Sequence, residues 1–167
     1  MPANLGPVIT LYNEANTSTV DTWSVGTVKA QEPSAALVVN IWNNRGNNTE
    51  DHSDLRECTL TVLDANGNTA TEDVARDKWV ECKMKAESDW MKIGGSGSAF
   101  ASKKVTANTA TAGEGILKGT MNDGQLDTSG ANVATVSFRI NAPINSTPGN
   151  KSFKIRLTGY YLSLIHI

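Results

Sequence analysis

Short stretches of alternating apolar and polar residues run through the chain. The clearest cover residues 132–140 and 151–161, where every second side chain is apolar. These apolar positions are Ala134, Val136, Phe138, Ile140, Phe153, Ile155 and Leu157. Because successive side chains of a strand point to opposite faces, a period of two predicts strands with one buried face. No stretch keeps a 3.6-residue period; residues 73–85 come closest, but alternation describes them better.

Several shorter stretches also predict strands. They cover residues 8–12, 57–63, 78–84 and 90–93, with weaker candidates at 100–106 and 115–121. Turn residues separate them, among them Asn66-Gly67, a dipeptide typical of hairpin turns, and the prolines that interrupt residues 141–149. About eight to ten short strands with frequent turns predict an all-β fold, an antiparallel β-sandwich.

Residues 22–45 are central to this prediction. Two runs rich in β-branched and aromatic residues flank a polar segment, and we expect two strands that either pair or lie in opposite sheets. In the second run, Leu37, Val39 and Ile41 share one face. That face is expected to build the core. Asn40 and Trp42 point the other way, so we expect them on an outer face.

Length and charge limit the possible classes of protein. With 167 residues, the chain suits one domain, which we place at residues 1–161. The net charge is −2 and the basic residues are scattered, which argues against a nucleic-acid surface. No apolar run is long enough for a membrane span, and the first residues lack the pattern of a signal peptide. We therefore expect synthesis in a cytoplasm, unless a signal was removed.

Cys58 and Cys82 both lie on apolar faces of predicted strands. Two alternatives are open: two buried thiols that act as small apolar groups, or a disulfide between neighbouring or facing strands. Without a histidine nearby, the two sulfurs are poor metal ligands.

No set of residues forms a catalytic pattern. His52 lies in the polar loop 43–54, which we expect to be exposed and mobile, and the carboxylates of this loop and of residues 72–77 are expected to be solvated. Asp64-Ala-Asn-Gly-Asn68 begins like a calcium loop, but its glycine comes two positions early and position twelve is not Glu. We therefore predict a hairpin turn there, no metal, no cofactor and no enzymatic activity.

Some motifs resemble those of bacterial immunoglobulin-like domains. They are Trp23-Ser-Val-Gly-Thr-Val28, the strand ending Asn-Ile-Trp-Asn-Asn-Arg-Gly46, and Ile140-Asn-Ala-Pro143 followed by Pro148-Gly149. The resemblance implies an immunoglobulin-like sandwich. The phrasing TWSVGTV, IWNNRG, DKWVECKM and IGG is also similar to small structural proteins of phages and prophages of Gram-positive gut bacteria. That similarity implies a virion component, either a capsid decoration protein or a tail or baseplate accessory. Its implied partners are other virion proteins or further copies of the chain as a homo-oligomer.

The last residues, 162–167, differ in character from the rest. They resemble translated adapter sequence at the end of an assembled read; the alternative is a genuine extension of the last strand.

The four tryptophans are the remaining candidates for binding. Trp42 and Trp79 lie off the more apolar face of their predicted strands, so we expect them, with Asn40, to contact a partner. A subunit contact is the favoured interpretation. The alternative is a carbohydrate-binding or adhesion module, in which exposed rings would stack on a host surface glycan.

Overall fold

The computed structural model describes residues 5–68, 71–110 and 114–162. It confirms the all-β class, with eight strands in two antiparallel sheets. The strands are β1 (Ile9–Asn13), β2 (Leu37–Asn43), β3 (Arg56–Asp64), β4 (Val80–Met84), β5 (Met91–Lys92), β6 (Lys103–Lys104), β7 (Val133–Ile140) and β8 (Phe153–Tyr160). Two short helical turns complete the elements: α1 (Asp73–Arg76) and the 3₁₀ turn η1 (Gly97–Ala99). Residues 163–167 of the predicted tail lie outside the described residues.

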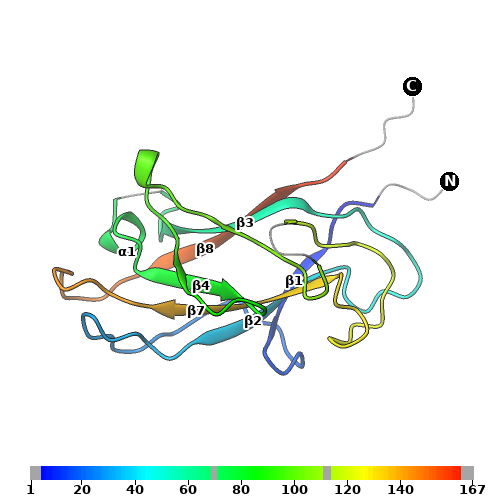
Figure 1. Ribbon diagram of the computed structural model, residues 1–167, viewed down its shortest axis with the longest axis horizontal. Coiled ribbons are helices and arrows are strands. Elements are labelled where there is room, and N and C mark those ends of the chain that lie inside the picture. The colour runs from blue at the N-terminus through cyan, green and yellow to red at the C-terminus, as the bar shows by residue number, and fades with distance from the viewer. Residues whose placement is uncertain (1–4, 69–70, 111–113, 163–167) are drawn as a thin grey trace.

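The strands form two layers (Figure 1). A five-stranded sheet has the order β1-β2-β7-β4-β5, and a three-stranded sheet has the order β6-β3-β8. The alternation in the sequence explains the buried faces of β7 and β2, two inner strands of the five-stranded sheet. In β7 the positions Ala134, Val136, Phe138 and Ile140 are all buried, and in β2 Val39 and Ile41 face the same core.

The core lies between the sheets. Its largest fully buried side chains include Ile41, Leu60, Val62, Val80 and Val136. Each buried aliphatic side chain of this size contributes roughly 1.5–3 kcal/mol relative to an exposed one. The alternating strands of the two sheets therefore carry most of the stability.

Two predicted strands do not form. Residues 21–28 belong to no strand and make no backbone–backbone hydrogen bond to any described residue, and Gly26, with φ +80°, leaves the β region in the middle of the run. The stretch 115–121 contributes only a bridge between Leu117 and Leu55. The strands predicted at 90–93 and 100–106 form only in part, as the two-residue strands β5 and β6.

The turn at Asn66-Gly67 is confirmed, but the hairpin predicted there is wrong. Gly67 N–H donates to the Asp64 carbonyl at 2.9 Å, and Asp64 N–H donates to the Asn68 carbonyl at 2.8 Å. The turn does not join two paired strands, because β3 and β4 belong to different sheets. The buried Asp64 carboxylate instead accepts the N–H groups of Thr71 and Glu72, just before α1.

One side of the sandwich is closed by the chain itself. Between β5 and β6 the chain crosses from one sheet to the other, and Gly94 and Ala101 exchange two backbone hydrogen bonds of 2.9 and 2.8 Å. The Ala101 carbonyl also accepts a hydrogen bond from the Thr61 hydroxyl of β3 at 3.1 Å. The opposite side, where β1 and β8 are the outermost strands, has no such crossing among the described residues.

Candidate functional site

An open groove of about 570 Å³ lies between the sheets on the side of β1 and β8. Its lining is largely apolar and comes from five strands of the two sheets, β1, β2, β3, β7 and β8, and from the segment after β1. The apolar lining residues are Ile9, Leu11, Val20, Trp23, Leu37, Val39, Ile41, Leu60, Phe138, Phe153, Ile155 and Leu157. The groove exists because the three-stranded sheet leaves the inner face of β1 and β2 partly uncovered.

Trp23 closes one end of the groove. Its ring meets Phe153 edge-to-face, with centroids 5.7 Å apart and an interplanar angle of 88°, and it lies 6.4 Å from the ring of Phe138. Aromatic pairs favour such tilted and edge-to-face arrangements. Trp23 therefore anchors residues 21–28 against the core even though these residues form no strand.

The two outermost strands differ in how free their edges are. The free edge of β1 is paired in its C-terminal half by the segment that follows it in the chain. Val20 N–H donates to the Leu11 carbonyl at 2.9 Å, and Tyr12 and Thr19 form a β-bridge. Among the described residues, β8 pairs with β3 alone. Its outer edge is therefore an unpaired strand edge beside an apolar groove.

The side chains of β8 alternate between the two faces of its sheet. Phe153, Ile155 and Leu157 line the groove and stay half-buried, because no strand covers them. Lys154 and Arg156 are exposed on the other face. The sequence predicted this alternation correctly, but it did not predict that the apolar set would face an open groove.

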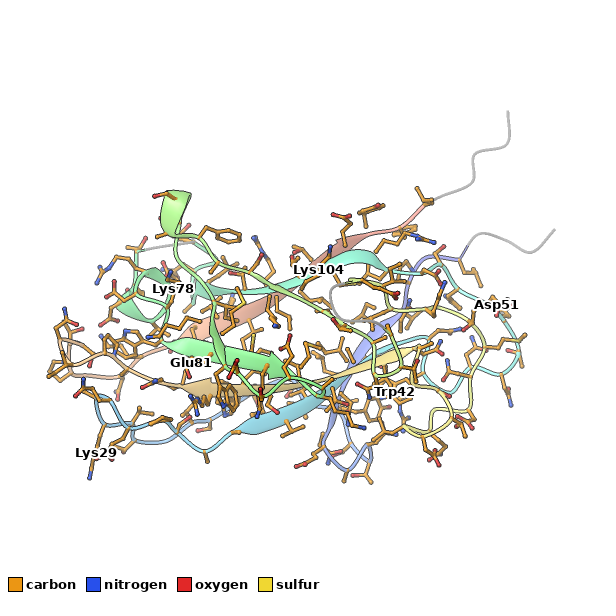
Figure 2. All side chains as sticks on the ribbon, in the orientation of Figure 1. Lys29, Trp42, Asp51, Lys78, Glu81 and Lys104 are labelled. Carbon is orange, nitrogen blue, oxygen red and sulfur yellow. The ribbon has the colours of Figure 1, made fainter. Side chains whose placement is uncertain are left out.

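The predicted exposure of Asn40 and Trp42 is wrong. Both side chains are fully buried, because the loops after β1 and before β7 cover the outer face of β2. Trp42 Nε1 donates to Asn16 Oδ1 at 2.9 Å, and the Asn40 amide donates to the Asn13 carbonyl at 2.7 Å. Figure 2 shows Trp42 at the end of the molecule where these loops gather.

Trp79 is also not available as a partner contact. Only 6% of its surface is exposed, and Lys151 lies over its ring at 5.7 Å. The fourth tryptophan, Trp90, is half-buried and has the Arg139 guanidinium 4.3 Å and the Lys83 ammonium 5.0 Å from its ring centroid. Trp42 and Trp79 thus offer no open ring for stacking on a sugar, and the two half-buried rings, Trp23 and Trp90, already contact other side chains.

Buried asparagines hold the loops over β2, a role that the local sequence pattern does not reveal. Asn43 Nδ2 donates to the carbonyls of Ser53 and Leu117 at 3.0 Å each, and Asn44 Nδ2 donates to those of Glu50 and Gly119. The loop 43–54 is therefore fastened at several points instead of projecting freely. The available signal was the pair of asparagines at the end of the predicted strand, Asn43 and Asn44.

Both cysteines are free and buried, so the interpretation as buried thiols is confirmed and a disulfide is excluded. Burial raises the pKa of Cys58 to about 11 and that of Cys82 to about 12. Such thiols stay protonated at neutral pH and are poor nucleophiles.

The polar residues considered for chemistry serve structural contacts. His52 Nδ1 lies 2.8 Å from the Gly6 carbonyl, and Asp54 accepts the Gly119 N–H at 3.0 Å and contacts Lys118 at 3.2 Å. Within the described ranges, no three His, Cys, Asp or Glu residues lie close enough together to hold a metal ion. Those ranges also contain no helix of the length and apolarity that crossing a membrane requires.

Comparisons of the chain with protein-family models, with curated proteins and with solved structures found no match. The immunoglobulin-like and phage resemblances thus rest on the motifs alone.

Proposed function

We propose that the protein is a non-catalytic structural component of a phage particle that binds other protein subunits. The observation that carries the binding role is the apolar groove with the unpaired edge of β8 beside it. Exposed apolar surface of this kind on a folded domain is typical of a protein-interaction site. The phage assignment is supported by the sequence motifs TWSVGTV and IWNNRG.

The polar groups favour this proposal over an enzyme. The best candidate base, His52, contacts a backbone carbonyl, and the carboxylates near it bind backbone N–H groups and lysine. None of these groups lines the groove. The groove therefore offers apolar contacts and a strand edge, which suit a polypeptide better than a reacting small molecule.

The surroundings of the tryptophans favour a protein partner over a glycan. Sugar-binding faces present aromatic rings with one side open, whereas Trp23 packs on Phe153 and Trp90 lies against two cations. The alternative of a carbohydrate-binding module would need a platform other than the four tryptophans.

Mass spectrometry of purified particles of the encoding phage tests the proposal. We expect the protein at a fixed ratio to the major capsid protein in independent preparations, and at that same ratio after a high-salt wash. A non-structural protein of the same phage, followed through the same purification, is the control. Absence of the chain from the particles, or loss in parallel with the control, would refute the proposal.

A further inference from the structure

The three-stranded sheet ends in a vacant strand position. The outer edge of β8, a strand of eight residues, presents the N–H and C=O groups of every second residue, and no described residue pairs with them. On the closed side of the sandwich the chain bridges the sheets, so the vacancy is confined to the β8 side. An unpaired edge of this length is a template for another extended chain.

The groove determines the inward side chains of such a chain. A strand added beside β8 would lie over the inner face of β1 and β2, where Leu11 is 40% exposed. Its inward side chains would meet Ile155 and Leu157 from β8 and Leu37 from β2, all half-buried lining residues of the groove. These positions call for apolar residues at every second place.

The opposite face of β8 determines the outward side chains. Lys154 and Arg156 are exposed there, and Lys104 of β6 joins the same face through its pairing with Thr59, next to Thr158. No described residue forms an ion pair with any of these three cations. A chain with acidic residues opposite Lys154 and Arg156 would neutralise them, since opposite charges on facing strands are stabilising.

The same charges disfavour a second copy of β8 as the occupant. Antiparallel pairing of two β8 edges would continue one sheet and place Lys154 and Arg156 of both copies on one face. Like charges facing each other across a strand pair are destabilising.

We propose that β8 accepts an extended segment of a partner protein in which apolar and acidic residues alternate. The segment becomes the fourth strand of the three-stranded sheet, with its apolar side chains in the groove and its acidic ones beside Lys154 and Arg156. This inference rests on the proposed function, because it specifies the partner of a subunit-binding protein.

Fluorescence anisotropy with a labelled peptide tests the inference on the full chain. The probe is Thr-Val-Glu-Val-Glu-Val-Thr, whose length matches most of β8 at about 3.3 Å per residue. We expect saturable binding, and binding about tenfold weaker for the matched peptide with Lys in place of Glu. The double variant Lys154→Glu/Arg156→Glu should invert this preference. Both positions are exposed, so circular dichroism should show an unchanged fold.

Two backbone-methylated probes separate strand addition from adhesion of an apolar or charged peptide. One carries N-methyl groups on the valines and the other on the glutamates. Because only alternate residues of an added strand direct their N–H groups at β8, one isomer should lose binding and the other should keep it. Equal behaviour of the two isomers would overturn the inference, as would an unchanged preference in the double variant.

Sedimentation of the protein alone identifies competing occupants. We expect a monomer that binds the peptide. A dimer that the peptide cannot dissociate would assign the edge to a second copy, and a monomer that binds no peptide would show the edge to be closed; both results overturn the inference. Neither result bears on the presence of the protein in virions, so the failure of this inference is distinguishable from that of the proposed function.

Discussion

Trp23 and Phe153 meet edge-to-face, although 130 positions of the chain, from 23 to 153, separate them. The contact joins a segment without backbone pairing to the first residue of β8, at one end of the groove. It explains how residues 21–28 stay on the core without belonging to a sheet.

Replacing Trp23 by alanine should destabilise the protein by about 2–3 kcal/mol, because it removes a half-buried aromatic side chain and its ring contacts. Trp23→Phe keeps an aromatic ring and should cost less than about 1.5 kcal/mol. Urea unfolding measures both. Phe100→Ala, at an aromatic side chain that is 45% exposed and lies outside the groove, is the matched control and should change little. Equal effects at positions 23 and 100 would contradict the anchoring role.

Asn40 should prove to be a structural residue, not a binding residue. Its amide donates to the Asn13 carbonyl, and its Oδ1 accepts the Thr135 hydroxyl at 2.6 Å in a fully buried position. Asn40→Leu leaves these partners unsatisfied, which should cost about 2–3 kcal/mol. A double-mutant cycle with Thr135→Val should show a coupling energy of about 1 kcal/mol in denaturant unfolding. Additive effects would show that the pair does not interact.

The local pattern was sufficient to predict most long strands and their inner faces. The alternation in residues 132–140 and 57–63 requires one buried face, whichever strands lie beside them. In the structure, β7 and β3 bury that face. The same logic failed for the outer face of β2. Whether Asn40 and Trp42 meet solvent depends on loops that are distant in sequence. The polar composition of these loops gave no sign that asparagine amides would hold them over a tryptophan.

The groove could not be predicted for a related reason. Its existence depends on strand order, since three strands face five, and local periodicity does not specify which strand lies at an edge. One signal was present in β8 itself. Lys154 and Arg156 on its outward positions are typical of an edge strand that must avoid unwanted pairing.

The two thiols should make stability fall at alkaline pH. Burial raises the pKa of Cys58 from about 9 to about 11, so the unfolded chain loses its proton first as the pH rises. The unfolded state then binds fewer protons than the folded state, and the free energy of unfolding decreases with pH between these values. Cys82, with a pKa of about 12, extends the same trend. Unfolding in urea at pH 8 and pH 10 should show the decrease, and Cys58→Ala should reduce it.

The same burial should protect the thiols from reagents. At pH 8, a chromogenic disulfide reagent should react slowly with the native protein and rapidly in concentrated urea, since only the unfolded chain exposes thiols with an ordinary pKa. Fast reaction of the native protein would show that one cysteine is accessible.

Gly119 should tolerate no side chain. A Cβ at this position would lie 2.5 Å from the carbonyl oxygen of Ser53 and closer still to that of His52, and both obstacles are backbone atoms. The close approach allows His52 N–H to donate to the Gly119 carbonyl at 2.8 Å and joins the loop after β2 to the segment before β7. Gly119→Ala must push these segments apart, so we expect the free energy of unfolding in urea to fall by about 2–3 kcal/mol.

Lys118→Ala, at the neighbouring exposed position, is the control. It removes only a surface ion pair with Asp54 and should change stability by less than about 1 kcal/mol. A mild effect at Gly119 would mean that the loops over β2 can separate without loss of the fold, and that the burial of Trp42 does not depend on their contact.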